Sequence, residues 1–158
     1  MKHVLTACVV SFLLLTYAIS GRGQAWRRIV PLKSTRTDVE QLLGPSKEVY
    51  FADYKLKDGN LFIEYSSGPC RPDRKGGWNV PENTVVLLSF TPRIKKSIKS
   101  LKLDPQKFRK VVGTHVGGVI YYINDEDGIS YEVQEGKIDS VEYAPRKRDN
   151  HLYCGDPA

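Results

Sequence analysis

The chain has 158 residues, of which 41% are hydrophobic and 27% charged, and its 24 Lys and Arg against 18 Asp and Glu give a formal net charge of +6. A basic excess of this size favours solubility and acidic partners, and it identifies no particular ligand. Nucleic-acid binding is excluded as the expected role, because the sequence contains no recognised binding motif and export would remove the usual target.

The first twenty residues have the layout of a secretory signal peptide. Lys2 precedes an apolar run over residues 4–17, and Ala18 and Ser20 form a small-x-small cleavage site before Gly21. The run is shorter than a membrane span of roughly 20 residues, and a transmembrane anchor is the alternative. We therefore expect a periplasmic or secreted protein with no transmembrane segment after cleavage. Removal of 20 of the 158 residues leaves 138, enough for one domain or two very small repeats sharing a core.

Two of the three cysteines remain after cleavage. Cys8 leaves with the signal segment, and its position before most of the apolar run excludes a lipoprotein box. In an oxidising compartment, Cys70 and Cys154 are expected to form a disulfide. The alternative is a metal site that uses His151, three residues before Cys154, and His115, but it lacks a second close-spaced Cys/His pair. We expect no metal and no cofactor.

The first predicted element is a short helix that ends at Gly44-Pro45. Thr35 suits the N-cap position, and Asp38 follows three residues later as in a capping box. The apolar face of this helix has the i, i+3, i+4 spacing, at Val39, Leu42 and Leu43.

Three strands are predicted after the helix. Residues 48–54 and 60–66 are rich in β-branched and aromatic residues and flank an Asp58-Gly59 turn, which indicates a hairpin. The run TVVLLSF, residues 84–90, has apolar residues at both odd and even positions, which point to opposite faces of a strand. It predicts a strand in the middle of the sheet, buried on both faces under a helix.

The connection before this third strand contains GPCRPDRKGGWNVP, residues 68–81, and has about 17 residues, far more than a hairpin loop. It lacks the strand-to-helix context and the G-x-x-x-x-G-K-[ST] spacing of a phosphate-binding loop. If Cys70 holds the loop, the loop is a better candidate for partner recognition, with Trp78 as an anchor, than for chemistry. The alternative is that Trp78 packs over a sheet edge and the rest is a spacer. The candidate binding residues are Arg71, Arg74, Lys75, Trp78 and Asn79.

A basic amphipathic segment follows at residues 93–103, with apolar residues at helical spacing among lysines. We interpret it as a solvated linker, and the alternative is contact with anionic lipid or an acidic protein. The candidate contact residues are Lys95, Lys96 and Lys99. Residues 104–113 predict another short helix, because Asp104 can cap it, Pro105 suits its first position, and Phe108, Val111 and Val112 share a face.

The last third of the chain predicts a meander over residues 118–124, 129–134 and 137–143. Apolar and polar residues alternate cleanly in ISYEVQ, so one face should be buried and one wet. The order helix, strand, Asp-Gly, strand occurs twice in the chain. We therefore expect an α+β fold, an antiparallel sheet with short helices packed on one face, or two αβββ-like repeats sharing one core. The expected divisions are 21–92, a basic linker at 93–103, and 104–158.

The run IVPLKSTRTDVEQLLGPSKE resembles the opening helix of the SmpA/OmlA family, whose best-known member is BamE. The likeness rests on an Ile-x-Pro lead-in, a Thr cap and a Val before Leu-Leu-Gly-Pro, carried by Ile29, Pro31, Thr35, Val39, Leu42, Leu43, Gly44 and Pro45. It extends more loosely to Ser66, about a quarter of the chain. The resemblance implies a small α+β domain that acts by protein contact in the cell envelope. Two such units in tandem would be similar in layout to the β-lactamase inhibitor protein.

Motifs for catalysis are missing from the sequence. There is no G-x-S-x-G and no S-x-x-K. The acidic run before Gly128 is out of register for a calcium loop, so we expect a hairpin turn with positive φ at this glycine. Glu132, Glu142 and Asp139 could supply paired carboxylates, but their alternation with apolar residues favours an outer sheet face.

We expect an exported small domain that acts by protein-protein contact in the cell envelope or outside the cell, with a partner the sequence does not identify. The first alternative is an enzyme whose site is not visible as a linear motif. The second is a binder of anionic surfaces.

Overall fold

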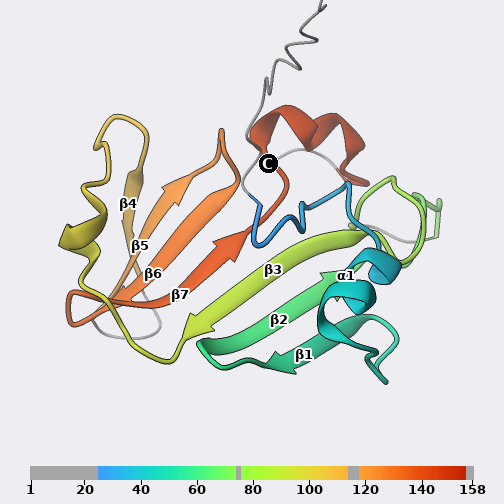
Figure 1. Ribbon diagram of the computed structural model, residues 1–158. Helices are drawn as coiled ribbons and strands as arrows, with labels where there is room; N and C mark the ends of the chain where they lie inside the picture. The colour runs from blue at the N-terminus through green and yellow to red at the C-terminus, as the bar shows by residue number, and fades with distance from the viewer. Residues whose placement is uncertain (1–24, 74–75, 114–117, 156–158) are drawn as a thin grey trace, which may run out of the picture.

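The computed structural model describes residues 25–73, 76–113 and 118–155, and its strands form one seven-stranded antiparallel sheet (Figure 1). The strand order is β1-β2-β3-β7-β6-β5-β4. The first meander contains β1 (Phe51–Lys55), β2 (Gly59–Tyr65) and β3 (Val85–Pro92). The second contains β4 (Arg109–Val112), β5 (Val119–Asn124), β6 (Ile129–Gln134) and β7 (Lys137–Tyr143).

The two meanders join where β3 pairs with β7. Three register pairs make this joint, and they run from Leu88 opposite Tyr143 to Phe90 opposite Val141. The sheet is therefore continuous, with β1 and β4 at its two edges. The prediction that residues 84–90 form a strand in mid-sheet is confirmed.

The helix α1 (Arg36–Leu43) begins and ends as the sequence predicts. The backbone N–H of Thr35 donates to Asp38 Oδ2 at 2.7 Å, and the N–H of Asp38 donates to Thr35 Oγ1 at 3.3 Å, which completes the capping box. Gly44 follows the last turn with φ 92°. Val39 is fully buried and fixes the helix to the sheet.

The face of the sheet that carries α1 is called the helix face. Val39 belongs to one buried cluster with Ala52, Leu61, Ile63 and Leu88. Residues 25–34 complete the cover over the first meander, because the N–H of Leu32 donates to the carbonyl of Val85 and the ring of Trp26 lies 5.7 Å from that of Phe90. The opposite face is called the loop face.

The expected fold class, an α+β sheet with short helices packed on one face, is wrong. Among the described residues α1 is the only α-helix; the other helical elements are two 3₁₀ helices, η1 (Ile98–Leu101) and η2 (Lys147–Leu152). The protein is closer to an all-β fold, and the described part of the chain does not contain two repeats that each contribute an α-helix.

The predicted second helix, residues 104–113, is a turn followed by strand β4. The carbonyl of Asp104 accepts from the N–H groups of Lys107 and Phe108, so one turn does form after the capping residue. Val111 and Val112 then pair with β5 opposite Tyr121 and Ile120. β-Branched residues lose little by leaving a helix, and the ladder with β5 decides their conformation.

Both predicted hairpin systems are confirmed, but their glycines differ in role. β1 pairs with β2, and β5, β6 and β7 form the expected meander. Gly59 lies inside β2 rather than in the turn, and a Cβ there would overlap the carbonyl oxygen of Thr91. Gly128 has φ 66° as expected, and the side chain of Asn124 closes this turn by accepting from the N–H of Asp127 at 3.1 Å.

Replacement of Gly128 by alanine should destabilise the fold strongly. The residue would keep a positive φ, and its Cβ would overlap the carbonyl oxygen of Ala144. We expect Gly128→Ala to lower the free energy of unfolding by about 3 kcal/mol in urea titrations. Gly136→Ala is the matched control, because Gly136 has φ 73° and open space around it. That control should lose about 1 kcal/mol from backbone strain alone, and equal losses in both variants would contradict the overlap.

Candidate functional site

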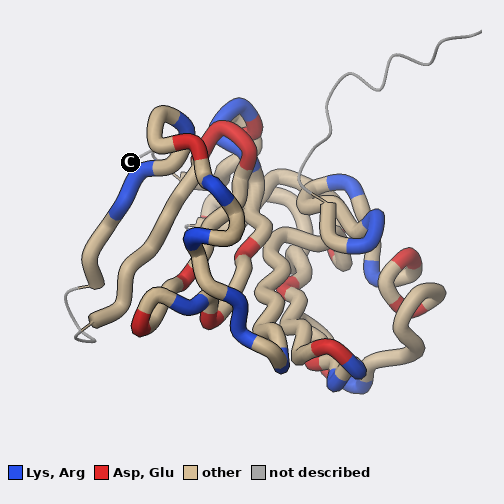
Figure 2. The backbone as a smooth tube through the Cα atoms, turned by 60° about the vertical axis from the view of Figure 1, so that its left-hand side comes forward, with Lys and Arg blue, Asp and Glu red and all other residues tan. Residues whose placement is uncertain are grey.

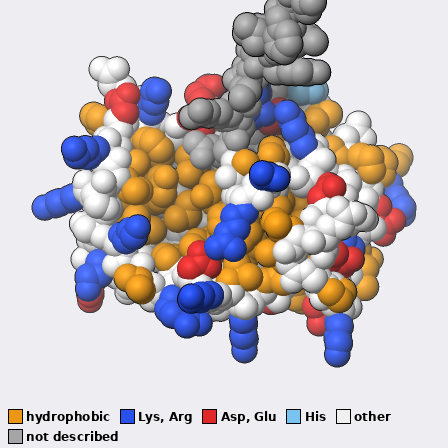
Figure 3. Space-filling view, viewed as in Figure 1, with side chains coloured by type: hydrophobic (Ala, Val, Ile, Leu, Met, Phe, Trp, Pro, Cys, Tyr) orange, Lys and Arg blue, Asp and Glu red, His pale blue; other side chains and the backbone are white. Residues whose placement is uncertain are grey.

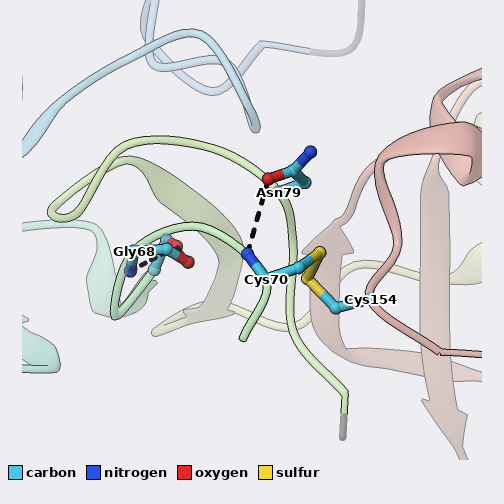
Figure 4. Close-up of a disulfide and its surroundings, with 5 residues drawn as sticks. Gly68, Cys70, Asn79 and Cys154 are labelled. Atoms are coloured by element: carbon cyan, nitrogen blue, oxygen red, sulfur yellow. Dashed lines mark hydrogen bonds between the residues drawn. A yellow bond between two sulfur atoms is a disulfide. The ribbon is translucent and has the colours of Figure 1, made fainter. Parts of the chain in front are cut away.

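The long connection between β2 and β3 is fixed by the Cys70–Cys154 disulfide, which confirms the predicted pairing (Figure 4). The two Cα atoms are 5.4 Å apart, and 84 positions separate the cysteines in sequence. The bridge therefore ties a loop of the first meander to the segment that follows the second one.

Main-chain hydrogen bonds reinforce the bridge. The N–H of Cys154 donates to the carbonyl of Gly77 at 2.9 Å, and the N–H of Asn79 donates to the carbonyl of Leu152 at 2.7 Å. Trp78 and Tyr153 form an antiparallel bridge, and their rings meet edge to face at 5.3 Å. The loop is thus held along residues 76–79 as well as at one covalent point.

A hollow of about 370 Å³ lies between this loop and the sheet. Glu64 and Leu87, which project from the loop face, line it on the sheet side, and Arg71 and Trp78 line it on the loop side. The disulfide lines it as well. The disulfide and the main-chain bonds of residues 76–79 hold the loop at the border of the hollow.

A second hollow of about 450 Å³ lies next to the first, and Ala144 and Pro145 line both. Side chains on the loop face of β5, β6 and β7 line its sheet side, and these are Ile123, Ser130 and Glu142. The two hollows together are called the loop-face groove.

The groove carries charges of both signs. Burial raises the pKa of Glu142, and the carboxylates of Glu132 and Glu64 raise it further. Basic residues line the ends, where Arg109 pairs with Asp125 at 3.1 Å and Arg71 is exposed. The groove thus has a half-buried carboxyl in its middle and guanidinium groups toward its two ends.

The structure divides the binding residues predicted in the loop. Arg71 and Trp78 line the groove. Asn79 has a structural contact instead, because its Oδ1 accepts from the N–H of Cys70 at 3.4 Å (Figure 4). Arg74 and Lys75 lie outside the described residues. Trp78 packs on Tyr153 of the C-terminal segment and also borders the hollow, and its role as a partner anchor stays a prediction.

The predicted anionic-surface residues lie apart from the groove. Lys95 forms an ion pair with Asp139, and the carbonyl of Lys96 accepts from the N–H of Ile138. Lys99 lies in η1 and is exposed. These lysines belong to the segment between β3 and β4 and do not line either hollow.

The candidate carboxylates are also divided. Glu132 and Glu142 share the loop face, but Asp139 pairs with Lys95. Within the described part of the chain, no three His, Cys, Asp or Glu side chains are grouped to hold a metal ion. His151 Nδ1 lies 3.0 Å from the carbonyl oxygen of Arg148, and His115 is outside the described residues.

Three residues at the groove, Tyr153, Pro145 and Arg109, were not predicted from the sequence. The alternation in residues 129–134 did indicate a solvent-exposed face, and polar residues on that face line the sheet side of the second hollow. Nothing in the neighbouring sequence places Pro145 or Arg109 at this hollow. They reach it because the order of strands in the sheet brings β4, β6 and the residues after β7 together.

Comparisons of the chain with protein-family models, with curated proteins and with solved structures each returned no match. Among the described residues, none of the helices has the length and apolar character needed to cross a membrane. The disulfide is compatible with a protein outside the cytoplasm. The predicted signal peptide lies outside the described residues.

Removal of the disulfide should destabilise the protein and loosen the groove. For a closed loop of 84 positions, the chain-entropy model gives a loss of about 4.5 kcal/mol in the Cys70→Ser, Cys154→Ser variant. Urea unfolding of the variant and of the unreduced parent measures this loss. Treatment of the parent with a reductant should reproduce this loss. A variant as stable as the parent would contradict the stabilising role of the disulfide.

Replacement of Glu142 by the neutral glutamine should stabilise the protein at a pH where Glu142 is ionised and should have no effect at a pH where Glu142 is protonated. Because the folded state raises the pKa of Glu142 above the value of 4.5 that a free glutamate has, stability falls as pH rises from 4.5 through the raised pKa. We expect Glu142→Gln to melt at a higher temperature than the parent at pH 8 and at the same temperature at pH 3. Glu82→Gln, at an exposed position, is the control. A gain for Glu142→Gln that is equal at both pH values would contradict the assignment.

Proposed function

We propose that this chain is an exported domain that acts by binding another protein, and that the loop-face groove receives an extended segment of that partner. The observation that carries the proposal is the fixed loop. A connection of this length normally costs entropy when it is ordered against a ligand. Here the disulfide and the main-chain bonds of residues 76–79 have already ordered it.

The lining of the groove favours a polypeptide ligand. Trp78 and Tyr50 offer aromatic surface at one end, and aromatic side chains in partly desolvated hollows are common anchors for partners. The half-buried carboxyl of Glu142 favours a basic side chain in the middle, while Arg71 favours an acidic side chain or a carbonyl oxygen. A lining with both charges fits a peptide better than it fits a uniformly anionic polymer.

The cellular place in this proposal is the periplasm or the exterior of the cell. The sequence supports it through the signal-like residues 1–20, and the resemblance of residues 29–45 to the SmpA/OmlA opening helix supports a role in the envelope. The disulfide is compatible with both locations.

The enzyme alternative is supported by one observation, the raised pKa of Glu142 in a groove. A carboxyl whose pKa is raised by burial can act as a general acid. Binding and turnover differ in the fate of the ligand, so mass spectrometry of a bound peptide after long incubation distinguishes them. An intact peptide supports binding, and a cleaved or modified peptide supports the enzyme.

Peptides selected from a random display library should bind in the groove. We expect Trp78→Ala to weaken the selected peptides by about 30-fold, which corresponds to about 2 kcal/mol at a hot spot, and Arg71→Glu to change the charge preference of the selection. Fluorescence anisotropy of labelled peptides measures the affinities. Lys57→Glu makes the same charge change as Arg71→Glu at an exposed site away from the groove. The proposal is wrong if no peptide is selected, or if Trp78→Ala binds the selected peptides as tightly as the parent.

A further inference from the structure

The helix face of the sheet is covered by α1 and residues 25–34 in one half and only partly covered in the other. Over β1 to β3, α1 and residues 25–34 bury the apolar side chains. Over β4 to β7, the described residues contain no α-helix. Figure 3 shows a broad hydrophobic area on this side of the second meander, beside the part of the sheet that α1 covers.

Strand register identifies the residues of this area. Leu88 and Phe90 belong to the core beneath α1 and pair with Tyr143 and Val141, so these β7 side chains share the helix face. The same alternation continues across β6, β5 and β4. The apolar patch consists of Val112, Ile120, Tyr122, Tyr131 and Val141.

The patch is incompletely covered. The side chain of Val112 is 63% exposed, and the other four residues are half-buried. Phe108 reaches over the patch, with its ring 5.8 Å from that of Tyr131. On the same face Ile129, Val133 and Ile138 are buried around the patch, so the incompletely covered area is limited to the five patch residues. A contiguous apolar area of this kind commonly marks an interaction surface.

The chain that borders the patch is strongly basic. Residues 93–110 contain eight Lys and Arg and one acidic residue, Asp104. The segment hydrogen-bonds to the start of β7 through Lys96 and Ile98, and it ends in β4, where Lys110 lies opposite Tyr122 on the helix face. Figure 2 shows these basic positions recurring along the chain between β3 and β4.

Most of these charges lack an acidic partner within the described chain. Lys95 pairs with Asp139 and Arg109 with Asp125. Lys99, Lys102, Lys107 and Lys110 form no ion pair among the described residues. An occupant of the patch with carboxylates along its side would therefore meet unpaired ammonium groups.

We propose that the apolar patch is the docking site for an amphipathic helix of a partner protein, with acidic residues beside its apolar stripe. The protein already shows the geometry, since α1 packs on the same face of the same sheet through Val39. The basic border sets the charge of the partner, because complementary charge steers association and selects among helices of equal apolar area.

Other occupants fit the patch less well. A second copy of this chain would bring two sets of lysines together, and its α1 has its buried Val39 in its own core. Residues 1–20 are apolar but carry Lys2 and no acidic residue. An anionic membrane would match the charge, but four of the five patch residues are half-buried in the sheet face, and insertion into lipid needs side chains that project.

This inference is independent of the loop-face groove, because strand alternation places the two surfaces on opposite faces of the sheet. Glu142 points to the groove while Tyr143, the next residue of β7, joins the core on the helix face. The domain would thus have two binding surfaces, and one partner could occupy each.

The test uses the disulfide-bonded chain and a designed helical peptide with leucines at i, i+3, i+4 and i+7 and glutamates along both sides. The comparison peptides are its lysine counterpart and a scrambled sequence of equal composition. We expect fluorescence anisotropy to show that the acidic peptide binds at least about 10-fold more tightly than the lysine peptide or the scrambled peptide. The lysine peptide lacks charge complementarity to the basic border, and the scrambled peptide lacks a continuous apolar stripe to bury in the patch.

Val112→Asp should weaken the acidic peptide by at least about 10-fold, because it places a carboxylate in the patch. Val49→Asp is the matched control, since Val49 is 61% exposed and lies outside the patch. Lys110→Glu should weaken binding as well, while Lys57→Glu should leave it unchanged. Circular dichroism and melting temperatures establish that each variant folds.

Three results would overturn the proposal. The first is absence of binding by the acidic peptide, and the second is equal binding to Val112→Asp and Val49→Asp. The third comes from vesicles of phosphatidylglycerol. If these vesicles bind the chain and displace the peptide, and Val112→Asp abolishes that binding, the patch is a membrane contact instead.

Discussion

The pairing of β3 with β7 is the interaction on which the rest of this fold depends. It is short, three register pairs, yet it converts two separate meanders into one sheet. Apolar packing compensates for its length, because Leu88 is fully buried and Tyr143 packs against the same core. Without the joint, β3 and β7 would both be open edges with unpaired backbone groups. The loop after β2 would also lose its neighbour, the segment after β7 that contains Cys154.

The same joint makes the two surfaces parts of one structure. Alternate residues of a strand point to opposite faces, so Glu142 and Tyr143 serve the groove and the core from adjacent positions on β7. A shift of β7 by one residue would exchange them, placing a carboxyl in the core and an aromatic ring in the groove. The register that protects the core therefore also sets the chemistry of the groove.

Local features of this protein could be predicted from sequence, and features that depend on sheet order could not. Thr35 and Asp38 are three residues apart and identify the start of α1 by themselves. The hairpins and the positive φ of Gly128 are equally local. The helix predicted for residues 104–113 was wrong. A capping residue, a proline and one apolar face suit a helix, but the ladder with β5 overrides them, and β5 comes from residues further along the chain. The disulfide could be predicted because only two cysteines follow the signal-like segment, so each has a single possible partner within the chain. The groove beside the disulfide was predictable only in part. Arg71 and Trp78 are close to Cys70 in sequence, but Arg109, Ser130 and Glu142 meet only in the folded sheet.

The bridge between Cys70 and Cys154 has a mechanical consequence. Because the cysteines lie 84 positions apart, the covalent path from one end of the chain to the other can bypass all residues between them. Tension applied at the two ends would run through the residues before Cys70, cross the sulfur atoms and leave through the last four residues. Strands β3 to β7 lie inside the bypassed loop and would carry no load, whereas β1, β2 and α1 lie directly in the path. Under traction α1, β1 and β2 are therefore the parts that yield, whereas β3 and the second meander keep their shape.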